Sequence, residues 1–484
     1  MTPSGSLGLR GRTLRSFLLL GAQRVVGLLV TMVGGIVLAR LLVPDVFGVY
    51  AVIGFVVGLG VIFSDLGLGA ALIQRRDLDP TATLGAASTA NLALALALGA
   101  AIAALAPLIV RSLGLAPEAA EPLRVLALLI PLSALRMPAA VLLERHLAYV
   151  PLTIAETLDT VAFHVVAVAA AIDGAGVWSF VLGALAGRVA GLAVLWRSTG
   201  SWPRLRWCWS DLEPVLKFGM WFQGSAVVSL VRDAVGPTFV LKWSGVTAIG
   251  FLNWAATLSL LPLQFVSIAG RVLFPALSRL QEYPREFGEA TERVLGRVAV
   301  VLYPAALFLV AGADPVVRLI YGTAWLPAVP AIRFFCLSAL LGGTSNVLVH
   351  ALYSLGRADL VFRLSVFWAA VVWILALVMV PRVGFVGLAV ASACMSATGS
   401  LAALAVRRLV PVRVLPQIRV PLAAGALGAM LLWLLANVWI HDIPSLVVGV
   451  SAAGGVYVAA ACLLGGAAWR AELVADWRIV WNGR

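Results

Sequence analysis

Two acidic residues and a histidine lie close together in an apolar stretch of the chain, PLTIAETLDTVAFHVVAV, residues 151–168. Glu156 and Asp159 are three positions apart, so a helix carries both carboxylates on one face, and His164 lies about 80° further round the same helix. Carboxylates and an imidazole inside such a helix can relay a proton or hold a sodium ion. We therefore predict cavity ion pairs or an H⁺ or Na⁺ site here. The helix dipole alone, which favours an acid near an N-terminus, is the alternative for Glu156.

Arginines in other apolar stretches are natural partners for these acids. Arg136 and Arg188 stand in two such stretches, Arg24 lies in GAQRVVG, and Arg232 is followed by Asp233 in SLVRDAVGP. A charged group at mid-bilayer costs at least ~2.5–3.5 kcal/mol on insertion scales, so it faces the protein interior or a water-filled cavity. We predict that the four arginines line a cationic cavity. Snorkelling to the headgroups is the alternative for Arg24, and a structural ion pair is the alternative for Arg232 and Asp233.

A further acid, Asp65, ends an uncharged stretch in SDLGLGAALIQRRD, residues 64–77. Gly67 and Gly69 beside it are small enough to let another helix approach closely. We predict either that Asp65 pairs with Arg24 across two adjacent helices or that it caps a break in its own helix.

The elements that position these residues are membrane helices. The chain has 484 residues, of which 62% are hydrophobic and 12% are charged, whereas a soluble domain is about a quarter charged. A spanning helix needs about 20 apolar residues, and a backbone in lipid must satisfy its own hydrogen bonds. We predict an all-α polytopic membrane protein with about fourteen spans: 16–39, 47–72, 84–110, 122–143, 152–172, 175–195, 216–241, 246–270, 296–313, 327–352, 360–380, 384–406, 418–438 and 445–468.

The basic residues of the connectors predict the orientation of the chain in the membrane. Of the 35 basic residues, 24 fall on the side of the N-terminus and 6 on the opposite side when these spans are applied. Basic residues accumulate in cytoplasmic loops. We therefore expect both termini to be cytoplasmic.

Two parts of the sequence resemble each other at an offset of 202 residues. LARLLVPDVFGVYA and VLKWSGVTAIGFLNWA align so as to match Arg40 with Lys242, Phe47 with Ile249 and Gly48 with Gly250. The match predicts an N-terminal lobe at 1–196 and a C-terminal lobe at 197–406, which starts with a basic linker at 197–217. Two extra spans and a tail follow at 407–484. Repeats of this kind in transporters enclose the substrate between their halves.

The sequence contains no motif of a known catalytic or metal site. GxSxG, HExxH and GxxxxGK[ST] are absent, and the four cysteines are far apart without a CxxC pair. A nucleic-acid partner would need a soluble basic face, which the sequence does not provide. We therefore expect a transporter and not an enzyme, with no cofactor and no nucleic-acid partner, but with possible coupling to H⁺ or Na⁺.

Three segments resemble the bacterial polysaccharide-biosynthesis flippases. The first is LARLLVPDVFGVYAVIGFVVGLGVIFSDLGLGAALIQ, residues 38–74, which is similar to the family's turn between spans 1 and 2 and its end of span 2. FPALSRLQ, residues 274–281, and LIYGTAWLPAVPAIRFFCLSAL, residues 319–340, are similar to later family segments. The resemblance covers about residues 1–410. The same superfamily includes peptidoglycan-precursor flippases and multidrug exporters of the MATE type.

The resemblance implies two six-helix lobes around a central cavity that opens alternately to each side. It implies that an undecaprenyl-diphosphate-linked oligosaccharide moves from the inner to the outer leaflet for surface or exopolysaccharide assembly. Cationic cavity residues suit such an anionic substrate, and Arg24 and Arg232 are positions that fit this part by span and depth. Membrane lipids, a polysaccharide polymerase and export machinery are the expected partners.

Two alternatives remain open from the sequence. A cation-coupled multidrug exporter of the MATE type would share the fold, although the DLGLGAALIQ stretch is more similar to the sugar branch. A membrane glycosyltransferase or polysaccharide polymerase belongs to another class. It would usually carry a sizeable loop outside the membrane, and the outward connectors predicted here are short.

Overall fold

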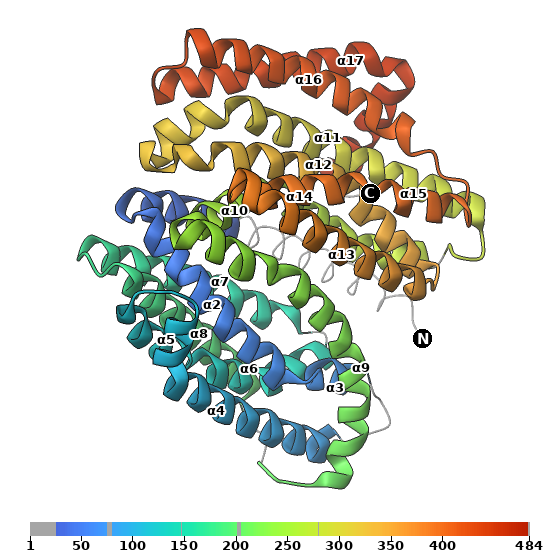
Figure 1. Cartoon of the computed structure of the whole chain (residues 1–484). Helices are drawn as coiled ribbons and strands as arrows, with labels where there is room; N and C mark the ends of the chain where they lie inside the picture. The colour runs from blue at the N-terminus through green and yellow to red at the C-terminus, as the bar shows by residue number, and fades with distance from the viewer. Residues whose placement is uncertain (1–25, 75–79, 147, 201–204, 279, 483–484) are drawn as a thin grey trace. The chain divides into compact units, whose positions relative to one another are not determined.

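The computed structural model is helical throughout the residues that it describes, which are 26–74, 80–146, 148–200, 205–278 and 280–482 (Figure 1). Within these residues, twelve helices are long and apolar enough to cross a membrane. This confirms the prediction of an all-α polytopic membrane protein. The count of fourteen stays a prediction for two reasons. The first predicted span begins outside the described residues and continues as the shorter helix Val26–Leu41. The predicted spans 216–241 and 246–270 both overlap a single candidate helix, Val228–Leu263.

The described residues form two compact units that divide after Pro237. Gly245–Gly250 belong with the first unit, while Thr238–Ser244 and the chain from Phe251 onward form the second. The predicted lobes at 1–196 and 197–406 are defined by a repeat and not by contacts, so they stay a prediction. In the first unit, helix Val26–Leu41 is followed by α2 Pro44–Asp65, α3 Leu68–Gln74, α4 Pro80–Ser112, η1 Pro117–Ala119, α5 Ala120–Leu126, α6 Leu129–Arg145, α7 Tyr149–Ile172, α8 Val177–Thr199 and α9 Trp209–Asp233.

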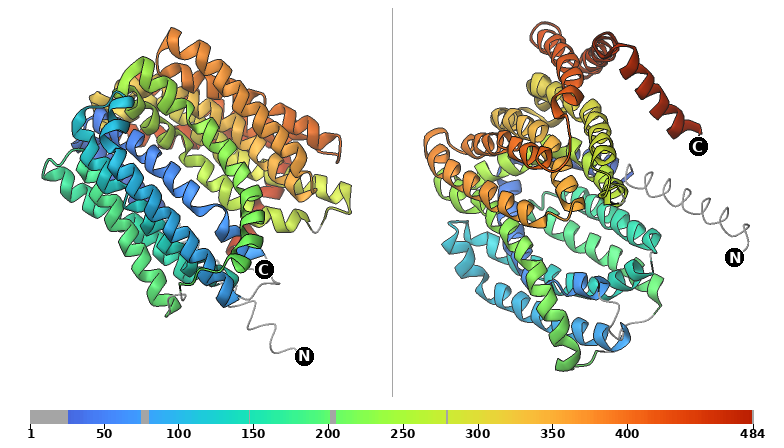
Figure 2. Two further views of the ribbon diagram at one scale, coloured as in Figure 1. Left: turned by 60° about the horizontal axis from the view of Figure 1, so that its bottom comes forward. Right: turned by 90° about the vertical axis from the view of Figure 1, so that its right-hand side faces the viewer.

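The second unit continues the chain with further helices, and the π-helical segment η2 leads into it. In this unit α16 packs on α11, and α17 packs on α16 (Figure 2). The elements from the unit boundary onward are η2 Gly236–Val240, α10 Leu241–Ser278, α11 Pro284–Val316, η3 Val317–Tyr321, η4 Thr323–Ala328, α12 Val329–Ser354, α13 Ala358–Val383, α14 Val386–Ala397, α15 Ser400–Arg407, α16 Val414–Val438 and α17 Ile443–Asn482.

Breaks in the helices fall at residues with left-handed backbone angles. Leu66 (φ 48°) and Gly67 (φ 71°) separate α2 from α3. Within α10, Gly245 is non-helical at φ 81° and ψ 179°, so the helix starts anew at the next residue. Glycine adopts these angles without a steric penalty, whereas for Leu66 they carry a steric cost.

Helices α7 and α8 form a hairpin whose contact is made by small residues. Gly183, Gly187 and Gly191 are spaced by one helical turn along one face of α8. An added Cβ at these three positions would come within 2.9 Å of a backbone carbonyl oxygen of α7, namely those of Phe163, Asp159 and Ala155. Apolar burial does not drive helix association in lipid, so such small residues allow the close approach that brings the helices together.

Candidate functional site

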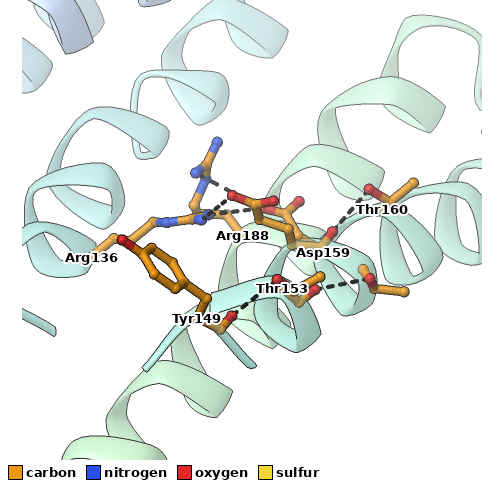
Figure 3. A network of polar contacts seen from close by, with 8 residues as sticks. Arg136, Tyr149, Thr153, Asp159, Thr160 and Arg188 are labelled. Atoms are coloured by element: carbon orange, nitrogen blue, oxygen red, sulfur yellow. Dashed lines mark hydrogen bonds and ion pairs between the residues drawn. The ribbon is translucent and has the colours of Figure 1, made fainter. Parts of the chain in front are cut away.

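Three helices of the first unit bring four of the predicted charged residues together (Figure 3). Arg136 extends from α6, Glu156 and Asp159 from α7, and Arg188 from α8. The guanidinium of Arg136 lies 3.7 Å from a Glu156 oxygen and 3.7 Å from an Asp159 oxygen. The guanidinium of Arg188 lies 3.8 Å from the same Asp159 oxygen. Asp159 is therefore shared by two arginines, which are its expected partners from the sequence.

The two arginines of this network keep hydrogen-bond donors to spare. All three contacts with the acids are longer than a hydrogen bond, so they are ion pairs without direct N–H···O bonds. The Nε atom of Arg188 is buried and has no hydrogen-bond partner within the described part of the chain. Leaving a buried donor unsatisfied costs about 1–3 kcal/mol. The arrangement is therefore suited to accept a further group with several acceptor oxygens.

Packing between α7 and α8 holds Asp159 in place. A Cβ added at Gly187 would lie 2.6 Å from the Oδ1 atom of Asp159 and 2.5 Å from its backbone oxygen. Distances this short force a neighbour to move, and the backbone oxygen has no rotamer to change. The absence of a side chain at Gly187 therefore lets the Asp159 carboxylate lie across α8, next to Arg188.

Two further groups lie close to the network, and the sequence did not single them out as site residues. Tyr50 on α2 interacts electrostatically with Arg188 and Asp159, and its ring stacks on Phe180 of α8 with centroids 4.7 Å apart. Tyr50 lies in the FGVY stretch of the family-like segment 38–74, which was the available signal.

The second of these groups is Glu144 near the end of α6. Its carboxylate lies close enough to Glu156 and Arg136 to feel their charges. The network thus contains three acids and two arginines, so an incoming cation or proton would balance its formal charge. In the sequence, Glu144 adjoins Arg145 at the edge of a predicted span and looks like a connector residue.

The other predicted site residues lie apart from this network. Arg232 and Asp233 pair with each other at 2.9 Å at the end of α9, with side chains that are 46% and 60% exposed. This agrees with the alternative of an ion pair between neighbours. His164 packs its ring against Gly34, and its Nδ1 lies 2.8 Å from the Thr160 carbonyl oxygen. The structure therefore does not bring His164 together with the acids of α7.

Asp65 lies at the break between α2 and α3. The backbone N–H groups of Gly67 and Gly69 donate hydrogen bonds to its carboxylate. Asp65 therefore caps the break, as the second of its two predicted roles requires. Its predicted partner, Arg24, lies outside the described residues. The pairing of Asp65 with Arg24 and the predicted place of Arg24 in the cavity therefore stay predictions.

The fold and the charge network are those of a helical membrane protein with partly exposed ion pairs between its helices. Comparison with known proteins gives the family. The family described as "Polysaccharide biosynthesis protein" matches residues 37–330. The chain belongs to this family, in agreement with the resemblance seen in its motifs.

Individual relatives agree with this assignment. The chain is 24% identical over 338 residues to the lipopolysaccharide biosynthesis protein WzxC of Escherichia coli (strain K12), covering 68% of each protein. It is 26% identical to the succinoglycan biosynthesis transport protein ExoT of Rhizobium meliloti (strain 1021), covering 69% of this chain and 67% of that protein. The lipid II flippase MurJ in an inward closed conformation shares the fold, with a TM-score of 0.78 at 14% identity over 92% of this chain and 98% of that one.

Proposed function

We propose that this protein flips an undecaprenyl-diphosphate-linked oligosaccharide from the inner to the outer leaflet of the bacterial inner membrane. Membership of the polysaccharide biosynthesis family supports this proposal. So do the name of ExoT, a succinoglycan biosynthesis transport protein, and the shared fold of MurJ, a lipid II flippase. The lipid tail stays in the bilayer while the sugar crosses through the polar interior.

The paired arginines Arg136 and Arg188 are the observation that carries the proposal. A diphosphate has about two negative charges and several acceptor oxygens, and a guanidinium binds such a group through two parallel N–H donors. Arg136 and Arg188 converge on one point from two helices with contacts of 3.7–3.8 Å that use up no donor in a hydrogen bond. Both arginines thus present donors to the diphosphate.

Binding of the diphosphate displaces Asp159 and Glu156 from the arginines. The side chains of these pairs are 21–54% exposed, so breaking the pairs costs less than the ~3–5 kcal/mol of a fully buried pair but still leaves partly desolvated charges uncompensated. The displaced carboxylates therefore need a counter-charge, which H⁺ or Na⁺ can supply. In this scheme Glu156 and Asp159 link substrate binding to the uptake of a cation.

The remaining parts of the proposal rest on the sequence. The lobes at 1–196 and 197–406 rock to open the passage to one side and then the other, with both termini in the cytoplasm. Arg24 adds positive charge along the passage, whereas the charge of Arg232 is balanced by Asp233. The product is handed to a polysaccharide polymerase and export machinery.

Transport in reconstituted vesicles tests this function. The purified protein is placed in liposomes that contain a fluorescent undecaprenyl-diphosphate-linked oligosaccharide, and a membrane-impermeant quencher reports the leaflet of the label. Each charge-assisted hydrogen bond contributes about 1.5–3 kcal/mol. The Arg136→Gln/Arg188→Gln double variant loses at least one from each arginine, about 3–6 kcal/mol in all, so flipping at low substrate should fall by about 100-fold or more. Arg124→Gln is the matched control, because Arg124 pairs with Glu121 on α5 of the same unit.

Three outcomes would contradict the proposal. Undiminished flipping by the double variant would remove the arginine pair from substrate binding. A new glycosidic bond in the recovered lipid would identify a transferase. Movement of a cationic drug without movement of the lipid-linked sugar would identify an exporter of the MATE type.

A further inference from the structure

The connector between α15 and α16 in the second unit is rich in arginines that no acid balances (Figure 1). Residues 407–419 read RRLVPVRVLPQIR, with Arg407, Arg408, Arg413 and Arg419. The sequence has no aspartate or glutamate between Asp359 and Asp442. All four arginines are exposed, and none of them forms an ion pair within the described part of the chain. This segment therefore carries four unbalanced positive charges.

One acid of α11 contacts this connector, but it binds groups other than a guanidinium. The carboxylate of Glu292 accepts the backbone N–H of Arg413 at 2.6 Å and the side-chain amide of Gln417 at 3.1 Å. The connector also packs closely on α11, because a Cβ added at Gly288 would lie 2.2 Å from the carbonyl oxygen of Pro411. These contacts fix the backbone of the connector and leave its guanidinium groups for another anion.

Exposed leucines stand on both sides of one of these arginines. Leu415, Arg419 and Leu422 are four and three positions apart, so they share one face of α16, and the leucines are 69% and 39% exposed. An arginine among apolar side chains keeps its stem on them and extends its guanidinium toward the headgroups. Helical side chains lean toward the N-terminus of their helix, so the side chain of Arg419 extends toward Arg413.

Two arginines can therefore reach the same phosphate. Arg413 and Arg419 are six positions apart, which is about 9 Å along a helix at 1.5 Å per residue. A guanidinium meets phosphate oxygens through parallel N–H donors, and the N-terminus of α16, at Val414, adds partial positive charge. We propose that Arg413 and Arg419 bind the headgroup phosphate of an anionic phospholipid, while Arg407 and Arg408 strengthen the attraction.

A lipid is the occupant that the position of the connector favours. Residues 408–413 join two candidate membrane spans, Val386–Arg407 and Val414–Val438, so they lie at one surface of the membrane. The predicted orientation makes this the cytoplasmic surface, where basic clusters next to a span attract anionic lipids. A soluble anion would contact the arginines alone, whereas the acyl chains of a lipid also cover Leu415 and Leu422. The inference is independent of the proposed flippase function, because it concerns a lipid that stays in its leaflet.

Quenching by nitroxide-labelled lipids measures the lipid composition beside the connector. Leu415→Cys is labelled with bimane in a variant whose native cysteines are replaced, and the full-length protein is placed in phosphatidylcholine vesicles. A minor fraction of either phosphatidylglycerol or phosphatidylcholine carries the nitroxide on an acyl chain. Phe362→Cys on α13 is the matched reference position, because Phe362 is 53% exposed and adjoins Arg363. Labelled phosphatidylglycerol should quench more strongly than labelled phosphatidylcholine at Leu415, and this preference should be much smaller at Phe362.

Replacing the arginines tests which groups hold the lipid. Each arginine near an anionic surface contributes about fivefold in affinity, so Arg413→Gln/Arg419→Gln should weaken the preference for phosphatidylglycerol at Leu415 about 25-fold. Arg357→Gln/Arg363→Gln removes the same charge and should leave it unchanged, because Arg357 pairs with Asp359. Both double variants should unfold at the temperature of the parent protein, since the replaced side chains are exposed.

Three results would overturn the inference. An equal preference at the two labelled positions that concentrated salt abolishes would reveal only the general attraction of a basic surface. An undiminished preference in Arg413→Gln/Arg419→Gln would remove these arginines from lipid binding. Loss of the preference with inorganic pyrophosphate, but not with sodium chloride at equal ionic strength, would identify a site for a soluble anion.

Discussion

Replacing Asp159 with Asn tests whether the charge network is an energetic unit. The amide keeps the size of the side chain but removes the charge that Arg136 and Arg188 share. Arg136 then retains Glu156 as a partner, whereas Arg188 loses its ion pair with Asp159. The variant should therefore be less stable than the parent protein.

The distances set the size of the effect. At an effective permittivity of about 20, two unit charges 3.7–3.8 Å apart attract each other by roughly 4 kcal/mol. Solvent weakens this attraction, because the side chains of Arg136, Asp159 and Arg188 keep 21%, 24% and 31% of their exposure. Breaking a fully buried pair costs about 3–5 kcal/mol and breaking a surface pair about 0–1 kcal/mol. We expect Asp159→Asn to lower the free energy of unfolding by about 2–3 kcal/mol, between these limits.

A double-mutant cycle with Arg188→Gln isolates the interaction. Unfolding in mixed detergent micelles is followed for the parent, both single variants and the double variant. Contacting charged residues show coupling energies of about 0.5–3 kcal/mol, and we expect about 1–2 kcal/mol for Asp159 with Arg188. Asp159→Asn combined with Arg357→Gln is the control, because Arg357 pairs with Asp359 in the second unit.

Additivity would refute the reasoning. If the Asp159 and Arg188 effects sum to within about 0.3 kcal/mol, the two side chains are not coupled. The displacement of Asp159 by a diphosphate would then have no energetic basis, and the arginine pair would need another explanation.

Three more predictions follow from the packing of single residues. Gly187→Leu should part α7 from α8 and reduce flipping and thermal stability together, whereas Val189→Leu on the exposed face of α8 should change neither. Glu292→Ala should speed proteolysis between α15 and α16, because its carboxylate accepts the backbone N–H of Arg413 at 2.6 Å. The hydroxyl of Ser445 and its backbone N–H both hydrogen-bond the Asp442 carboxylate at the start of α17, which lowers the pKa of Asp442 below 3.8. An acid whose pKa is lowered by folding stabilises the folded state above its unfolded pKa, and this stability is lost as the pH falls through the folded pKa. Hydrogen exchange at the start of α17 should therefore rise below about pH 4. The Asp442→Asn variant should not show this rise.

The helical character and most spans of the protein follow from hydropathy, because a backbone in lipid has few alternatives to a helix. The pairing of Glu156 and Asp159 with arginines also followed, since charges in apolar helices must find partners. Neither argument predicts how a helix is rotated about its own axis or which helices pack against it. For that reason the proximity of Tyr50 and Glu144 to the network was not foreseen.

Local contacts bear on two of the cases in which the sequence left alternatives open. Arg232 pairs with Asp233 because α9 ends there and leaves both side chains exposed. Asp65 caps the break after α2 because the turn at Leu66 aims the N–H groups of Gly67 and Gly69 at it. Backbone angles of this kind depend on tertiary contacts, which periodicity does not report.

The turn at Leu66 has a consequence for how this region acquires its shape. A leucine in the left-handed region is disfavoured by roughly 1–2 kcal/mol relative to right-handed helix, so its own residue type argues against the bend. Two contacts offset this cost: the Asp65 carboxylate accepts hydrogen bonds from the N–H groups of Gly67 and Gly69, and the α9 backbone lies against the Leu66 carbonyl oxygen. A peptide of residues 44–74 in micelles lacks the contact with α9. We therefore expect the bend at Leu66 to form only after α9 has packed against it during folding.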